Sequence, residues 1–144
     1  MKTRYTSLVS VKKNLMQKSE RALQSANANL QSAMSALELS FTELSSIETP
    51  TTGQISEFLS SRVLLDAQRN LIKHNEEWVL FTKKEIEEAQ EQLKKDMIEY
   101  EKFNYLELQE IKDILHKRKI QEAKDLDEIA LMTYDKKKPI RDAS

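Results

Sequence analysis

A long run of the chain contains neither glycine nor proline, because its only glycine is Gly53 and its two prolines are Pro50 and Pro139. Glycine and proline are the residues that most often end a helix or form a turn. An all-β chain needs such residues about every dozen positions. The sequence therefore allows one helix of roughly 80 residues after Gly53. The composition agrees, since 33% charged and only 6% aromatic residues are typical of long helices and coiled coils.

Before Pro50, mostly apolar residues recur in steps of 3, 4 and 4 positions, which places them on one face of a helix. Only Ser19 breaks this pattern. This eleven-residue repeat is close to the pitch of a straight α-helix, so it predicts little or slightly right-handed supercoiling. We expect a first helix at about 3–47. The predicted inner stripe is Leu8, Val11, Leu15, Ser19, Ala22, Ala26, Leu30, Ala33, Leu37, Phe41 and Leu44.

After the loop, the same steps predict a second helix at about 54–136. The connection at 48–53 has turn chemistry, because the residue before Pro50 is biased away from helical geometry and Gly53 suits a turn. We expect the tail at 137–144 to be basic and disordered. The predicted inner stripe is Leu64, Ala67, Leu71, Asn75, Trp78, Thr82, Ile86, Ala89, Leu93, Met97, Tyr100, Asn104, Leu108, Ile111 and Leu115.

A short connection between two helices places them side by side and antiparallel. The sequence thus predicts an all-α fold: a long two-helix antiparallel coiled-coil hairpin, a single unit over 1–144, whose second helix extends well beyond the first. Folding about Pro50 opposes residues whose numbers add to about 101, for example Ala22 with Trp78. It also opposes Ser19 with Thr82 and Asn75 with Ala26. Asn75 then either fixes the register from within the seam or lies at its edge.

This register leaves residues from about 101 to 136 without a partner in the chain. A helix with a large exposed apolar face usually marks an interaction site. The overhang therefore needs a partner chain, a second copy, or a fold-back. Its candidate contact residues are Phe103, Tyr105, Leu106, Ile114, Leu115, Ile120 and Leu126.

Several functions are not expected. The chain has no cysteine, and His74 and His116 lie too far apart on one helix to share a metal ion. A two-helix hairpin offers no desolvated pocket for acid–base catalysis, so we expect no enzyme activity, cofactor or metal. No apolar stretch reaches membrane-spanning length, which favours a cytoplasmic protein without direct membrane insertion. The basic segment from Lys2 to Arg21 could bind nucleic acid or an anionic membrane, but no aromatic stacking platform accompanies it.

Four features together resemble the FliJ family of flagellar type III export proteins, which is related to the YscO-type stalk proteins of injectisomes. The start "RYTSLVSVKKN" resembles the family's opening, and the first helix is rich in alanine and leucine, "ALQSANANLQSAMSAL". A loop and a long second helix follow. The end "EAKDLDEIALMTYDKKK" resembles the family's terminal stretch ahead of a basic tail.

The resemblance implies a non-enzymatic component of the export apparatus that supports flagellar biogenesis and motility. Such a protein resembles the central stalk of a rotary ATPase: its terminal end inserts into the hexameric export ATPase and promotes assembly and activity. It also links the ATPase to the cytoplasmic domain of the export-gate membrane protein and escorts export chaperones. The expected location is the cytoplasm, with peripheral association to the inner membrane through the apparatus.

The resemblance also assigns the candidate residues. The overhang residues, together with Lys12 and Lys13, would contact the ATPase ring. Leu65, Arg69 and Ile72 lie off the predicted seam and would contact the export gate, or they are ordinary outer-face residues. The alternative function is a self-associating structural coiled-coil rod, in which the overhang pairs with a second copy.

Overall fold

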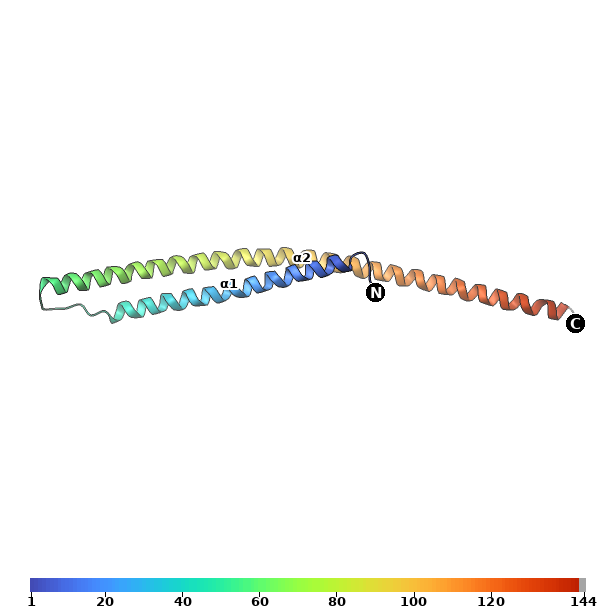
Figure 1. Cartoon of the computed structure of the whole chain (residues 1–144), viewed down its shortest axis with the longest axis horizontal. Coiled ribbons are helices and arrows are strands. Elements are labelled where there is room, and N and C mark those ends of the chain that lie inside the picture. The colour runs from blue at the N-terminus through green and yellow to red at the C-terminus, as the bar shows by residue number, and fades with distance from the viewer. Residues whose placement is uncertain (143–144) are drawn as a thin grey trace. The chain divides into compact units, whose positions relative to one another are not determined.

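The computed structural model describes the backbone of residues 1–142 and the side chains of residues 1–135. It contains two helices, α1 (Thr6–Ser46) and α2 (Ile55–Asp142), and no strand in the described residues (Figure 1). This confirms the predicted all-α hairpin with a longer second helix. The predicted tail at 137–144 lies outside the residues with described side chains. The chain divides into two compact units, one formed by Met1–Lys12 with Glu99–Ser144 and the other by Lys13–Ile98.

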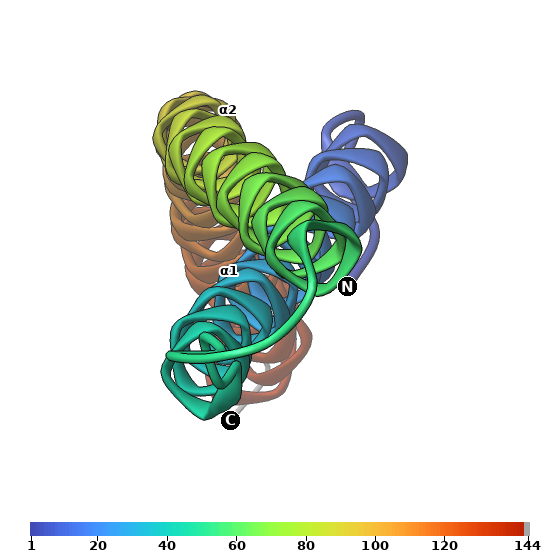
Figure 2. The same ribbon diagram turned by 90° about the vertical axis from the view of Figure 1, so that its left-hand side faces the viewer.

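The residues around the loop explain where the helices end and begin. Thr49 precedes Pro50 and is therefore biased away from helical geometry, and α1 ends before it, at Ser46. Gly53 has a φ of 145°, a conformation that favours glycine. The carbonyl of Gln54 then accepts the first amide bonds of α2, from Glu57 at 3.0 Å and Phe58 at 3.4 Å. Figure 2 shows the loop crossing from the end of α1 to the start of α2.

The seam between the helices has a heptad period. On each helix, the buried and half-buried side chains recur in alternating steps of 3 and 4 residues, which is the spacing of a left-handed coiled coil. On α1 the seam comprises Val9, Lys12, Met16, Ser19, Leu23, Ala26, Leu30, Ala33, Leu37, Ser40 and Leu44. On α2 it comprises Ser61, Leu65, Gln68, Ile72, Asn75, Val79, Thr82, Ile86, Ala89, Leu93, Asp96, Tyr100, Phe103, Glu107, Glu110 and Ile114.

The predicted eleven-residue period was therefore wrong. Val11 and Phe41 were expected inside but are 52% and 47% exposed, and Leu71 and Trp78 on α2 are 41% and 37% exposed. The reason is that many seam positions carry small or polar side chains. A pattern built from apolar residues misses these positions. It selects the large apolar side chains beside the seam instead.

The register was also wrong, by about ten residues. The Asn75 side chain donates to the carbonyl of Ala36 at 3.2 Å, where the sequence opposed it with Ala26. Ser19 donates to Asp96 and not to Thr82. The loop explains the shift, because Ser61 donates to the carbonyl of Glu48 at 3.5 Å. The first turns of α2 thus pair with the loop, and each residue of α1 meets a later residue of α2.

The interior of the hairpin is small and partly polar. Its buried apolar side chains are Ala26, Ala33, Ile72 and Val79. Its buried polar groups are all bonded among the described residues: Ser40 donates to the Leu37 carbonyl at 2.7 Å and Thr82 to the Val79 carbonyl at 2.9 Å. Asn75 is 7% exposed, so it lies in the seam and not at its edge. Small side chains bury little apolar area, so we expect the hairpin to have modest stability.

Candidate partner-binding surface

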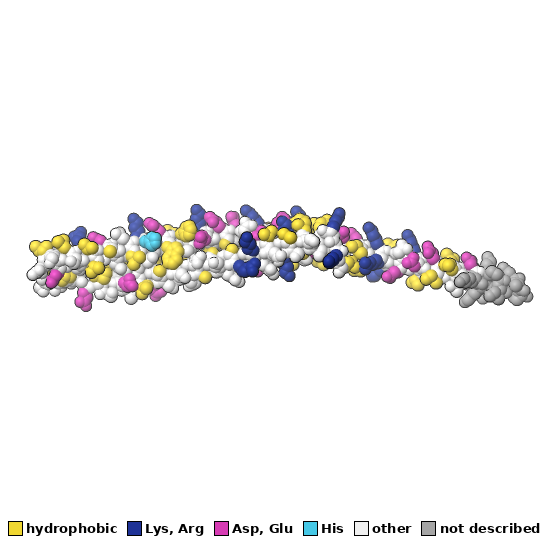
Figure 3. Space-filling view, viewed as in Figure 1, with side chains coloured by type: hydrophobic (Ala, Val, Ile, Leu, Met, Phe, Trp, Pro, Cys, Tyr) yellow, Lys and Arg dark blue, Asp and Glu magenta, His cyan; other side chains and the backbone are white. Residues whose placement is uncertain are grey.

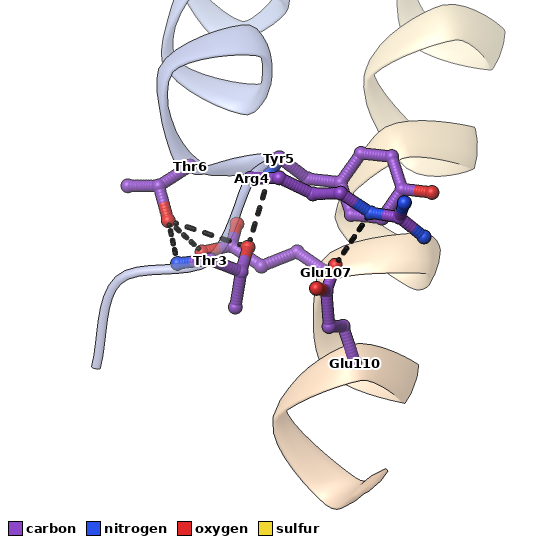
Figure 4. A network of polar contacts seen from close by, with 6 residues as sticks. All are labelled: Thr3, Arg4, Tyr5, Thr6, Glu107 and Glu110. Atoms are coloured by element: carbon purple, nitrogen blue, oxygen red, sulfur yellow. Dashed lines mark hydrogen bonds and ion pairs between the residues drawn. The ribbon is translucent and has the colours of Figure 1, made fainter. Parts of the chain in front are cut away.

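The N-terminal residues are tied to α2 by a polar network that we call the N-terminal clasp (Figure 4). The Arg4 guanidinium donates to Glu110 at 3.3 Å, and the Thr6 hydroxyl donates to Glu107 at 2.9 Å. The Thr3 amide in turn donates to the Thr6 hydroxyl at 2.8 Å. This last contact fixes the start of α1 much as a capping box does. The clasp holds the beginning of the chain against residues 107–110.

Lys12 continues this contact toward the start of α2, one to two helical turns before Glu107. Its ammonium lies 3.5 Å from the carboxylate of Glu99 and 5.7 Å from the centre of the Phe103 ring. Lys12 is half-buried, whereas Lys13, the next residue, is exposed. Both basic residues were predicted to contact a partner. Among the described residues, only Lys13 is exposed and makes no ion pair.

The predicted overhang at 101–136 starts too early. Because the register is shifted, the N-terminal segment covers part of it, and Phe103, Leu106 and Ile114 are half-buried. Arg4 and Tyr5 line one hollow together with Leu106, Glu110 and Ile114. These three predicted contact residues therefore belong partly to the interior of this unit.

Beyond the clasp lies a stretch of α2 that is exposed all round, residues 115–135, which we call the C-terminal stretch. Its hydrogen bonds are internal to α2, from Gln121 to Asp125 and from Thr133 to the Ile129 carbonyl. Three predicted contact residues lie in it, and Tyr105, which precedes it, is 61% exposed. The exposed large apolar side chains of the stretch are Leu115, Ile120, Leu126, Ile129, Leu131, Met132 and Tyr134. Figure 3 shows hydrophobic side chains at the surface among the charged ones.

The three residues assigned to the export gate do not form one outer face. Ile72 is 7% exposed and Leu65 is half-buried, and both occupy seam positions. Only Arg69 is exposed, 3.7 Å from the carboxylate of Asp66. Placing Leu65 and Ile72 off the seam was wrong, for the same reason as the period: the predicted seam ran one residue to the side, through Leu64 and Leu71.

The sequence reasoning missed an aromatic patch on α2. His74, Glu77, Trp78 and Phe81 line one shallow hollow, and Phe81 is 59% exposed. The predicted seam placed Trp78 inside against Ala22. A heptad count from Asn75 would have placed Trp78 outside, because Val79 fills the next seam position.

The described residues hold few other chemical features. No cluster of three or more histidine, cysteine, aspartate or glutamate side chains in them could hold a metal ion. Likewise, neither helix, as far as it is described, has a segment both long and apolar enough to cross a membrane.

Comparison with known proteins gives one match. Neither a curated protein nor a solved structure matches the chain. The model of the family described as "Flagellar FliJ protein" matches residues 1–139, which include the N-terminal clasp, α1, the loop and nearly all of α2. The chain therefore belongs to the FliJ family, whose members are non-enzymatic components of the flagellar export apparatus.

Proposed function

We propose that this chain is the central stalk of the export apparatus, a coiled coil whose terminal end inserts into the hexameric export ATPase and promotes its assembly and activity. The observation that carries the proposal is the C-terminal stretch, a helical segment with exposed apolar side chains that follows the N-terminal clasp along α2. A large exposed apolar surface is the usual mark of an interface. Because the chain belongs to the FliJ family, we look for its partner among the proteins of the flagellar export apparatus.

The exposed side chains are the proposed direct contacts. They are Tyr105, Leu115, Ile120 and Leu126, which are between 44% and 66% exposed. Lys13, which is exposed, would add a charge contact. Phe103, Leu106 and Ile114 would act indirectly, by holding α2 against the N-terminal segment. Lys12 shares that supporting role, since it already pairs with Glu99.

The links to the export gate and to export chaperones are further parts of the proposal. Arg69 is the exposed member of the residues assigned to the gate. The aromatic patch at Trp78 and Phe81 is the nearby exposed apolar surface on α2 and could complete that contact. Binding to the gate domain would hold the chain in the cytoplasm beside the inner membrane, with no insertion of its own.

The ATPase contact is tested by a triple variant, Leu115→Ala, Ile120→Ala and Leu126→Ala. We expect stimulation of the cognate export ATPase to fall about fivefold or more, because a few buried apolar anchors carry most of the binding energy at an interface. The measurement is the rate of ATP hydrolysis against the concentration of the chain.

A matched control carries Leu39→Ala, Leu59→Ala and Leu80→Ala, which remove leucines that are 59%, 59% and 67% exposed in the hairpin body. This control should stimulate hydrolysis as the unchanged chain does. Equal loss in both triple variants would move the contact away from the C-terminal stretch. Full stimulation by the first variant would refute the proposed contact.

A further inference from the structure

The C-terminal stretch carries its charges in two blocks of opposite sign. Residues 117–119 are Lys117, Arg118 and Lys119, with no acidic residue among them. The acidic block at 125–128 contains Asp125, Asp127 and Glu128 and no basic residue. The blocks are equal in charge and lie about two helical turns apart. Such a segment is electrostatically complementary to itself when it runs in the opposite direction.

The apolar side chains of the stretch are also not buried by the rest of the described chain. Its apolar side chains remain between 44% and 66% exposed, and its hydrogen bonds are internal to α2. The heptad positions that face α1 do not continue as apolar residues, because the positions after Ile114 are Lys117, Gln121 and Lys124. The hairpin seam thus ends near the start of α1, and the apolar side chains of the stretch are left exposed, where another helix can cover part of them.

We infer that this other helix is the same stretch of a second copy of the chain, paired antiparallel about Ala123. With Ala123 on the contact face, Lys119 and Asp127 lie on the same side of the helix, and Lys119 comes to the level of Asp127 of the second copy. Ile120 and Leu126 flank this face, and Ile120 comes to the level of the second copy's Leu126. Two-fold symmetry makes each of these pairings occur twice. A parallel pair would instead set each block beside its own copy, and like charges would repel.

The interface is small, so the dimer is expected to be weak. A single helix pair of this length buries an area at the low end for specific complexes, and we expect a dissociation constant on the order of 10 µM. Because the two charge blocks lie at the surface, salt should weaken the pairing. The pairing involves only the chain itself and does not rest on the proposed ATPase contact.

The test is a charge exchange in the full chain. One variant reverses the basic block (Lys117→Glu, Arg118→Glu, Lys119→Glu), and a second reverses the acidic block (Asp125→Lys, Asp127→Lys, Glu128→Lys). Each alone should dimerise at least about tenfold more weakly, because like charges then face each other. Mixing the two variants, or combining both reversals in one chain, should restore the dimer. Sedimentation equilibrium over a range of concentrations gives the constants.

A matched control reverses Lys73, Lys83 and Lys84 to glutamate, three exposed lysines of the hairpin body. It changes the net charge of the chain by the same amount as reversal of the basic block and should dimerise normally. The helix signal in circular dichroism should not fall in any variant, since each new lysine or glutamate has a helix propensity similar to or higher than that of the residue it replaces.

Two results would overturn the inference. One is a constant mass of a single chain at all concentrations up to about 500 µM, fiftyfold above the expected constant. The other is a dimer that survives reversal of one block or is not restored by reversal of both. The antiparallel direction of the pairing is checked independently by disulfide formation, since the chain has no cysteine of its own. Ala123→Cys should form a disulfide between two copies, whereas Tyr134→Cys should not.

Discussion

Replacing Ile72 by alanine is expected to lower the free energy of unfolding by about 2–4 kcal/mol. Ile72 is the largest apolar side chain among the buried residues of the seam, at 7% exposure, so its truncation should leave a cavity between the helices. The measurement is urea unfolding followed by helical circular dichroism.

The neighbouring change Leu71→Ala serves as its control. Leu71 is 41% exposed, so its removal should cost less than about 1 kcal/mol. The pair decides between the two possible seams, because the eleven-residue pattern places Leu71 inside and leaves Ile72 outside. A larger loss of unfolding free energy in Leu71→Ala than in Ile72→Ala would reject the heptad seam. A loss of gate binding in an Ile72 variant would also need this stability control before any contact is assigned.

Replacing Ala33 by leucine is expected to cost about 1–3 kcal/mol, because overpacking forces side chains and backbone apart. Ala33 is 0% exposed and lies in the row of small seam residues Ser19, Ala26, Ala33 and Ser40 on α1. A leucine there has no space between the helices. The same unfolding measurement detects the loss.

The same substitution at Ala22 is the comparison. Ala22 is exposed, so Ala22→Leu should leave the free energy of unfolding within about 0.5 kcal/mol of its original value. Both alanines belong to the stripe predicted from the sequence, which would make both substitutions equally harmful. Equal losses would therefore support the predicted stripe over the heptad seam.

The fold could be predicted from the sequence because its main determinants are local. The single glycine and the early proline fix where the hairpin turns, and the uninterrupted run after Gly53 allows the long second helix. These features depend on the conformations open to individual residues. They do not depend on which side chains meet across the seam.

The register could not be predicted in the same way, because the seam is chemically inconspicuous. Ser40, Ser61 and Gln68 occupy seam positions, but serine and glutamine resemble surface residues in a sequence. The extended loop added a shift that helix periodicity does not contain, and the Ser61 contact with Glu48 shows where it arises. The error in register also affected the candidate surface. The sequence correctly predicted exposed apolar residues such as Leu126, but it did not predict that the N-terminal segment covers Leu106 and Ile114.

The distance in sequence between the partners of the clasp has a consequence for biosynthesis. Arg4 bonds to Glu110, 106 residues later. At about 5–20 residues per second, roughly 5–20 s pass after translation of Arg4 before its partner is made. Throughout that interval the inner face of the nascent α1, where small residues such as Ala26 alternate with leucines such as Leu23 and Leu30, stays uncovered. The two helices can then close from the loop outward as α2 emerges from the ribosome, and the clasp is the last part of the molecule to form.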